Sequence, residues 1–163
     1  MYRWIRRWPG LSPARRLEWY PPFRAMSVRV LELADDWRRV RILLPLNAFN
    51  RNPGGGMFGG AIAALADPIA ALACNRVFPG HQVWTRAMHI DFRHEGRTDL
   101  ELRFVFTDAQ VEAIGAELAA RGRATPTFEY GFHDQHGRCC AHVVNTVAIR
   151  PAGYRPRHRK EQR

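Results

Sequence analysis

The run of residues 61–77 constrains the fold of this chain more than any other stretch of its sequence. It consists almost wholly of Ala, Ile, Leu and Cys, and it lacks the alternation of apolar and polar residues that marks a half-buried strand. An apolar surface on every side predicts a helix that is buried all round. A loop over residues 47–60, which contains five glycines, precedes this helix.

Strands are predicted on both sides of this helix along the chain. In each of them apolar or aromatic residues recur at every second position, so that one face of the strand is apolar. The predicted strands cover residues 28–33, 39–46, 83–92, 100–107, 125–133 and 138–149. No βαβ unit separates them, which predicts an α+β fold in which an antiparallel sheet wraps around one central helix.

Two shorter helices complete the predicted elements. The first covers residues 12–20, with Ser12 as its cap and a proline at its first helical position, and we expect it to stop at Pro21 and Pro22. The second covers residues 109–121, where Asp108 is the predicted cap and a glycine follows the last turn.

The formal net charge of +10 is concentrated at the two ends of the chain. Residues 1–24 carry six Arg and one Glu, and residues 150–163 carry six cations and one Glu, whereas the 13 cations and 13 anions of residues 25–149 cancel. We therefore expect one domain over residues 25–150, a basic N-terminal extension with a short helix over 1–24, and a basic tail over 151–163. Nucleic-acid binding would rest on the tails alone and is not expected.

The cysteines and the apolar segments bear on the cellular compartment. Cys74, Cys139 and Cys140 cannot all pair within the chain, which predicts reduced thiols and a cytoplasmic protein. No stretch reaches the roughly 20 apolar residues of a transmembrane segment. Residues 1–24 lack the apolar core of a secretory signal, so we expect a docked extension, with a membrane-surface or targeting segment as the alternative.

Two motifs point to chemistry that the rest of the sequence does not support. Gly54, Gly56 and Gly59 have the spacing of a dinucleotide-binding loop, but that loop requires a parallel βαβ unit. Histidines and cysteines crowd residues 133–142 and suggest zinc, yet their spacing matches no structural finger. A hairpin turn over residues 134–137 explains this second cluster better, and we expect no metal site.

Asp67 is the strongest candidate for a catalytic residue. It is the only charged residue between Arg51 and Arg76, and a buried carboxylate on an apolar helix is costly unless it is paired or functional. The alternative is that Asp67 caps a helix whose first position is Pro68. We favour catalysis, because a glycine-rich loop that enters a helix offers free N–H donors to a developing oxyanion.

The segment over residues 52–75 resembles the hotdog-fold thioesterases, in particular the PaaI-like acyl-CoA thioesterase group and an uncharacterised branch of it. In that group a His-Gly-Gly triplet precedes an aspartate; here Phe58 stands in place of the histidine, followed by Gly59, Gly60 and then Asp67 at the expected spacing. The resemblance implies the hotdog fold, a curved antiparallel sheet wrapped around a long central helix. It also implies a homodimer or a dimer of dimers, with active sites at the subunit interface.

The same resemblance implies a role for individual residues. Asp67 would act as general base or nucleophile, and the N–H of Gly59 or Gly60 would polarise the thioester carbonyl. Asn52 would position the acyl group or water, and Thr85 from the opposing subunit would hold the nucleophilic water. An apolar acyl tunnel and an arginine for the phosphates of the carrier complete the predicted substrate site. The candidate tunnel residues are Met57, Phe58, Trp84 and Met88, with ordinary core positions as the alternative. The candidate arginines are Arg86, Arg93, Arg97, Arg121 and Arg123.

These residues predict an acyl-CoA or related acyl thioester hydrolase. We expect it to need no metal and no cofactor other than the coenzyme A that the substrate carries. The replacement of the usual histidine by Phe58 leaves a second possibility, a hotdog protein that binds an acyl ligand without turning it over. Thiol release from a panel of acyl-CoA substrates distinguishes the two.

Overall fold

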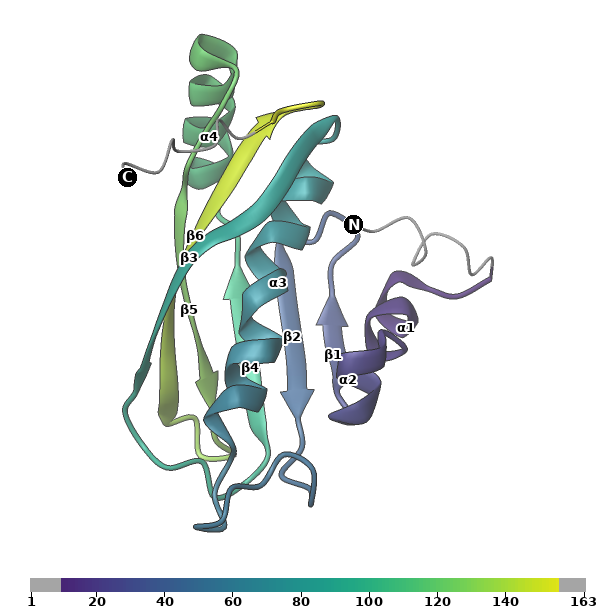
Figure 1. Ribbon diagram of the computed structural model, residues 1–163, viewed down its shortest axis with the longest axis vertical. Coiled ribbons are helices and arrows are strands. Elements are labelled where there is room, and N and C mark those ends of the chain that lie inside the picture. Colours follow the sequence, from purple (N-terminus) through teal and green to yellow (C-terminus); the bar gives the residue numbers. More distant parts are fainter. Residues whose placement is uncertain (1–9, 156–163) are drawn as a thin grey trace, which may run out of the picture.

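The computed structural model describes residues 10–155. Within them the chain forms four helices and six strands (Figure 1). In chain order these are α1 (Pro13–Glu18), α2 (Pro21–Ala25), β1 (Arg29–Leu33), β2 (Arg39–Leu44), α3 (Gly59–Val77), β3 (His81–Phe92), β4 (Leu100–Val105), α4 (Asp108–Arg121), β5 (Thr127–His133) and β6 (Cys139–Pro151).

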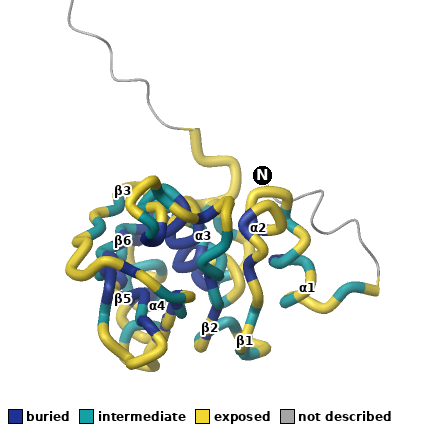
Figure 2. Tube along the Cα trace, turned by 90° about the horizontal axis from the view of Figure 1, so that it is seen from below, coloured by how far each residue is buried: buried dark blue, intermediate teal, exposed yellow. Residues whose placement is uncertain are grey.

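The six strands form one antiparallel sheet in the order β1-β2-β4-β5-β6-β3. The long helix α3 lies against one face of this sheet (Figure 1). In the end view of Figure 2 the buried parts of the strands face the buried parts of α3. The structure thus confirms the predicted α+β architecture of a sheet around a central helix.

Alternation along the strands places the core between the sheet and α3. On β2, Val40, Ile42 and Leu44 are fully buried, whereas Arg39 and Arg41 between them are exposed. The aromatic residues of neighbouring strands then meet on the same face. The ring centroid of Phe104 lies 5.7 Å from that of Phe128 and 5.4 Å from that of Tyr130. Such pairs add to the hydrophobic energy of the core.

Helix α3 continues through Pro68, so it does not begin at Asp67. The expectation that this helix is buried all round is wrong. Nine of its residues are buried, but Ala64 and Asp67, which lie one turn apart, are exposed and form a stripe on the side away from the sheet. Asn75 and Arg76, nearer the C-terminus of the helix, are exposed as well. The physical reason is that the sheet covers only one side of α3, and that α1 and α2 approach only its C-terminal half.

Helix α3 also satisfies the length and composition of a membrane span, the single case among the described residues. The mean hydropathy of its best window is 1.2, and 50% of that window is buried inside the fold. Core helices pass the same test, and α3 packs here as the core helix of the sheet.

The two edges of the sheet differ. Beside β1, the Glu18 carboxylate of α1 accepts a hydrogen bond from the Val30 N–H at 2.9 Å, so α1 partly covers that edge. The opposite edge is β3, whose outer side pairs with no described strand over 12 residues. A long unpaired edge is a template for pairing with another chain.

The ends of the shorter helices correct the sequence analysis in two places. Helix α1 ends before Pro21 and Pro22, as predicted, but the two prolines also begin α2, a short helix that was not predicted, because proline suits the first positions of a helix. The cap of α4 is Thr107 instead of Asp108: its hydroxyl accepts a hydrogen bond from the Gln110 N–H at 3.3 Å, and the Gln110 side chain accepts one from the Thr107 N–H. The caps predicted at Ser12 for α1 and at the glycine after α4 are confirmed.

Candidate active site

The N-terminus of α3 presents backbone donors. Phe58 is the N-cap and offers no side-chain hydrogen bond, while its carbonyl accepts hydrogen bonds from the N–H groups of Ala61 at 3.0 Å and Ile62 at 3.3 Å. The preceding N–H groups, those of Gly59 and Gly60, have no partner among the described residues. First-turn donors of this kind carry the positive end of the helix dipole, which suits an oxyanion.

Two phenyl rings cover these glycines. A Cβ atom on Gly60 would lie 2.4 Å from the ring of Phe58, and one on Gly59 would lie 3.1 Å from the ring of Phe92. A larger residue at position 60 would require the Phe58 ring to move. Both rings lie at the surface, with exposed fractions of 52% for Phe58 and 56% for Phe92. The glycines therefore permit a close approach, and in the single chain the two aromatic rings occupy that space.

Asn52 holds the loop that leads to these glycines. Its side-chain oxygen accepts a hydrogen bond from the Gly56 N–H at 3.2 Å, and its Nδ2 donates to the Met57 carbonyl at 3.3 Å. The sequence analysis missed Asn50, which is fully buried and donates from Nδ2 to the carbonyls of Met26 at 2.7 Å and Pro45 at 2.8 Å. Only contacts made after folding distinguish these two asparagines.

Asp67 lies on the exposed stripe of α3, about two turns from the glycines. The expected burial of its carboxylate is wrong for the single chain, because the side chain points away from the sheet. Its backbone carbonyl, in contrast, accepts hydrogen bonds from two side chains. Thr85 of the same chain donates to it from Oγ1 at 2.6 Å, and Asn145 donates from Nδ2 at 3.2 Å. Asp67 and Thr85, both predicted site residues, are thus brought together within one chain.

Tyr130 and Asn145 complete this polar cluster, and the sequence analysis named neither. The Tyr130 hydroxyl donates to the Ala66 carbonyl at 2.8 Å and accepts from Asn145 Nδ2 at 2.9 Å. Burial raises the pKa of Tyr130, and the nearby Asp67 carboxylate raises it further, although the hydrogen bond from Asn145 opposes the rise. The phenol therefore stays protonated and remains a donor. The cluster positions the central turn of α3 against the sheet.

The predicted substrate-binding residues do not form one surface in the single chain. Met57 is buried in the core, and Met88 on β3 also packs against it. Trp84 lies on the opposite face of β3 from Thr85, where its ring stacks on Tyr154 at a centroid distance of 5.9 Å. A tunnel that joins Trp84 to the methionines is therefore excluded within one chain. The predicted Arg86 is exposed, and it lies where the pairing of β3 with β6 shifts register.

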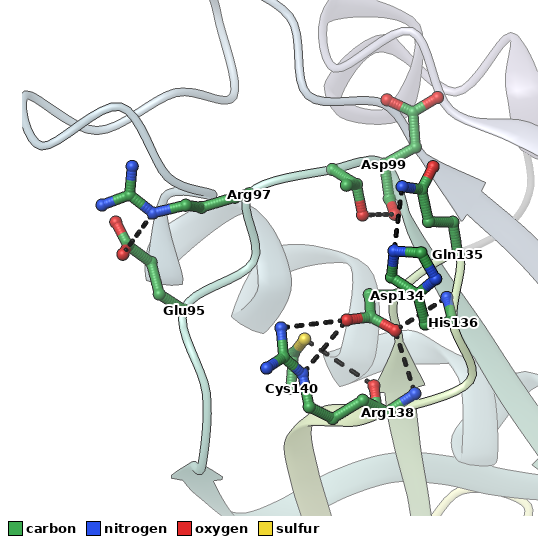
Figure 3. A network of polar contacts seen from close by, with 9 residues as sticks. Glu95, Arg97, Asp99, Asp134, Gln135, His136, Arg138 and Cys140 are labelled. Atoms are coloured by element: carbon green, nitrogen blue, oxygen red, sulfur yellow. Dashed lines mark hydrogen bonds and ion pairs between the residues drawn. The ribbon is translucent and has the colours of Figure 1, made fainter.

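The cluster of histidines and cysteines forms a hairpin turn, as predicted (Figure 3). Asp134 accepts hydrogen bonds from the N–H groups of His136 and Arg138, each at 2.9 Å, and from the Arg138 guanidinium at 3.1 Å. Burial alone would raise the pKa of Asp134, but these donors and the positive charge of Arg138 outweigh it and lower the pKa. Among residues 10–155 no three His, Cys, Asp or Glu side chains are grouped to hold a metal ion.

Comparison with known proteins places this geometry in a family. Residues 15–149, from α1 to β6, match the family described as "Domain of unknown function (DUF4442)". The chain belongs to the DUF4442 family. No curated protein matches it.

Several solved structures share the fold of this DUF4442 chain. A protein of unknown function from Pseudomonas aeruginosa, described as a probable thioesterase, is 20% identical with a TM-score of 0.75, over 84% of this chain and 92% of that one. A thioesterase from Haemophilus influenzae is 14% identical with a TM-score of 0.68, over 92% and 99%. A mutant of the phenylacetic acid degradation protein PaaI from Thermus thermophilus is 23% identical with a TM-score of 0.59, over 78% and 97%. The DUF4442 chain therefore has the hotdog fold, as the resemblance implied.

Proposed function

We propose that this DUF4442 protein hydrolyses acyl thioesters, with acyl-CoA as the substrate class. The observation that carries the proposal is that α3 presents unpaired N–H groups at Gly59 and Gly60 and a carboxylate at Asp67 on its uncovered side. The description of several similar structures as thioesterases supports the same chemistry. Asp67 takes a proton from water, and the hydroxyl oxygen bonds to the thioester carbon to give a tetrahedral intermediate. The C–S bond then breaks, the proton passes from Asp67 to the leaving sulfur, and a carboxylic acid and a thiol are released.

The length of α3 supports an active site that two chains share. Asp67 lies seven positions after Gly60, which is about 10 Å along the helix axis at 1.5 Å per residue. That separation is too long for both groups of one chain to act on a single carbonyl. A carbonyl held by the glycines of one chain would instead receive water held by Asp67 of a second copy. The unpaired edge of β3 and the uncovered stripe of α3 offer the surface for that copy.

This arrangement also assigns a role to Thr85. Because its hydroxyl contacts the Asp67 carbonyl of the same chain, we place it on the side of the site that holds the water. Thr85 and Asp67 then come from one subunit, and the glycines that bind the carbonyl come from the other. Asn52, whose side chain fastens its own loop, would act on the carbonyl side by fixing the glycines. The reaction uses no metal, and coenzyme A enters only as part of the substrate.

One observation favours a second candidate function. The rings of Phe58 and Phe92 lie against the two glycines whose N–H groups would bind the oxyanion. If the rings stay in place when ligand is present, the protein would bind an acyl thioester without hydrolysing it. Such a protein would be a carrier or a sensor.

Thiol release decides between the two candidates. Wild-type protein, Asp67→Asn and the control Glu112→Gln, which changes an exposed carboxylate on α4, are assayed with acyl-CoA substrates of graded chain length. We expect turnover by the wild type and the control, and a loss of about 10²–10⁴-fold in kcat for Asp67→Asn, the range that a general base contributes. Tight acyl-CoA binding without thiol release from any substrate would establish the second candidate instead. Full activity of Asp67→Asn would remove Asp67 from the mechanism.

A further inference from the structure

A cavity lies between the N-terminal helices and the C-terminal half of α3. Its volume is about 430 Å³, which is in the range of small-molecule sites. The cavity is walled by α1, α2, α3 and the turn between β1 and β2, so it lies near the covered edge of the sheet at β1, away from β3 (Figure 1). Its lining residues are Pro13, Arg16, Leu17, Tyr20, Phe23, Trp37, Pro68, Leu72, Asn75, Arg76 and Pro79.

The lining is apolar with two cations and no anion. Leu17, Phe23 and Leu72 are part of the core or pack against it, and they give the cavity an apolar body. Arg16 and Arg76 are the charged residues in the lining, and no Asp or Glu is present among the described residues that form it. The local charge is therefore positive and uncompensated.

Arg16 has an unsatisfied donor. Its Nε atom is buried and has no hydrogen-bond partner, and the side chain makes no ion pair with a described residue. Arg76 is only partly satisfied: its Nε donates to the Asp35 carbonyl at 3.3 Å, again without an ion pair in the described part of the chain. A buried guanidinium donor without a partner is costly, and a planar anion would satisfy it with two parallel hydrogen bonds.

Trp37, in another wall of the cavity, also indicates a binding site here. Its backbone adopts φ of 61°, in the left-handed region that a bulky residue seldom occupies. The Trp37 N–H donates to the Ala34 carbonyl at 2.8 Å, and this turn places the residue in the cavity wall. Strain of this kind often marks functional positions.

We propose that this cavity binds a carboxylate with an apolar chain, of the size of a medium-chain fatty acid. The carboxylate would pair with Arg16 and Arg76, and the chain would lie against the leucines and aromatic rings. Such an acid is also what thioester hydrolysis releases, but the proposal does not depend on that activity. Neither Asp67 nor the two glycines of the proposed active site line the cavity, so the two sites use different residues.

Calorimetric titration of the full-length protein with sodium decanoate tests the proposal. We expect saturable binding, and about tenfold weaker binding for Arg16→Gln, the cost of one hydrogen-bonded charge. The matched control is Arg15→Gln, on the same helix but outside the cavity, where it pairs with Glu18 at 3.3 Å. This control should bind decanoate as tightly as the wild type. Two further probes are decan-1-ol, which lacks the charge, and free coenzyme A, which carries phosphates without an acyl chain.

Three results would overturn the proposal. They are the absence of decanoate binding, an equal affinity of the Arg16→Gln and Arg15→Gln proteins, and binding of coenzyme A that competes with decanoate and is weakened by Arg16→Gln. The last would make the cavity a phosphate site. Because none of these measurements uses hydrolysis, a failed proposal leaves the function of the Asp67 site untested and unchanged.

Discussion

At the scale of single residues, Asp67 is held through its backbone more than through its side chain. Thr85 and Asn145 both donate to its carbonyl, and Tyr130 donates to the carbonyl one residue earlier. Pro68 lacks an N–H, so the Ala64 carbonyl loses its helical partner and the helix can deform at this turn. Side-chain donors from β3, β5 and β6 then fix the turn, which leaves the carboxylate free on the exposed side.

Removal of one of these donors should lower stability measurably. Tyr130→Phe deletes the hydrogen bond to the Ala66 carbonyl and leaves buried polar groups unsatisfied, which should cost about 1–2 kcal/mol of unfolding free energy. Chemical denaturation measures this cost. Tyr154→Phe, at an exposed position, is the control and should be neutral. Equal stabilities for the two variants would show that the cluster does not hold α3.

At the scale of elements, the strands were predictable and the exposure of α3 was not. Apolar residues at every second position, as in Val40 to Leu44 on β2, indicate which face of a strand is buried, and the structure confirms this prediction. The exposed stripe of α3 could not be predicted from a pattern of this kind, because its alanines would suit a covered face equally well. The contacts of Tyr130 and Asn145 with α3 span 64 and 78 residues of chain, so no local pattern announces them.

An ion-pair cluster on the paired strands β2 and β4 makes the free energy of unfolding depend on pH. Hydrogen bonds from Arg41 and Arg103 lower the pKa of Glu101 from 4.5 to about 2. Because the folded pKa is the lower one, this contribution is complete above pH 4.5 and is lost as the pH falls from there towards 2.

The variant Glu101→Gln isolates this contribution. Surface pairs contribute little, so we expect a loss of about 1 kcal/mol in unfolding free energy at pH 7. The difference from the wild type should shrink as the pH falls below 4.5. Denaturation curves at pH 7, 4 and 3 measure it, with Glu112→Gln on α4 as the control. A difference that stays constant with pH would assign the effect to something other than the charge.

At the scale of the whole molecule, the proposed active site requires two copies of the chain. Helix α3 is covered on one side, β3 is an unpaired edge of 12 residues, and the predicted catalytic groups are too far apart within one chain. Sedimentation should therefore give twice the mass of the chain or a multiple of that. A monomer at micromolar concentration would leave the proposed site incomplete.

The shared site is tested most directly by mixing two inactive variants. Asp67→Asn removes the carboxylate. Gly59→Pro removes one N–H donor at the first helical position, which suits the proline backbone, and Phe58 already has the extended backbone that precedes proline. The exposed Phe92 ring must move by a few tenths of an ångström to admit the new side chain. Each variant alone should be nearly inactive in thiol release. Because random pairing makes half of the dimers mixed, each with one intact site, co-expression should restore roughly a quarter of the wild-type activity. If the mixed protein stays as inactive as its parents while both variants fold and pair, the active site is not shared between two chains.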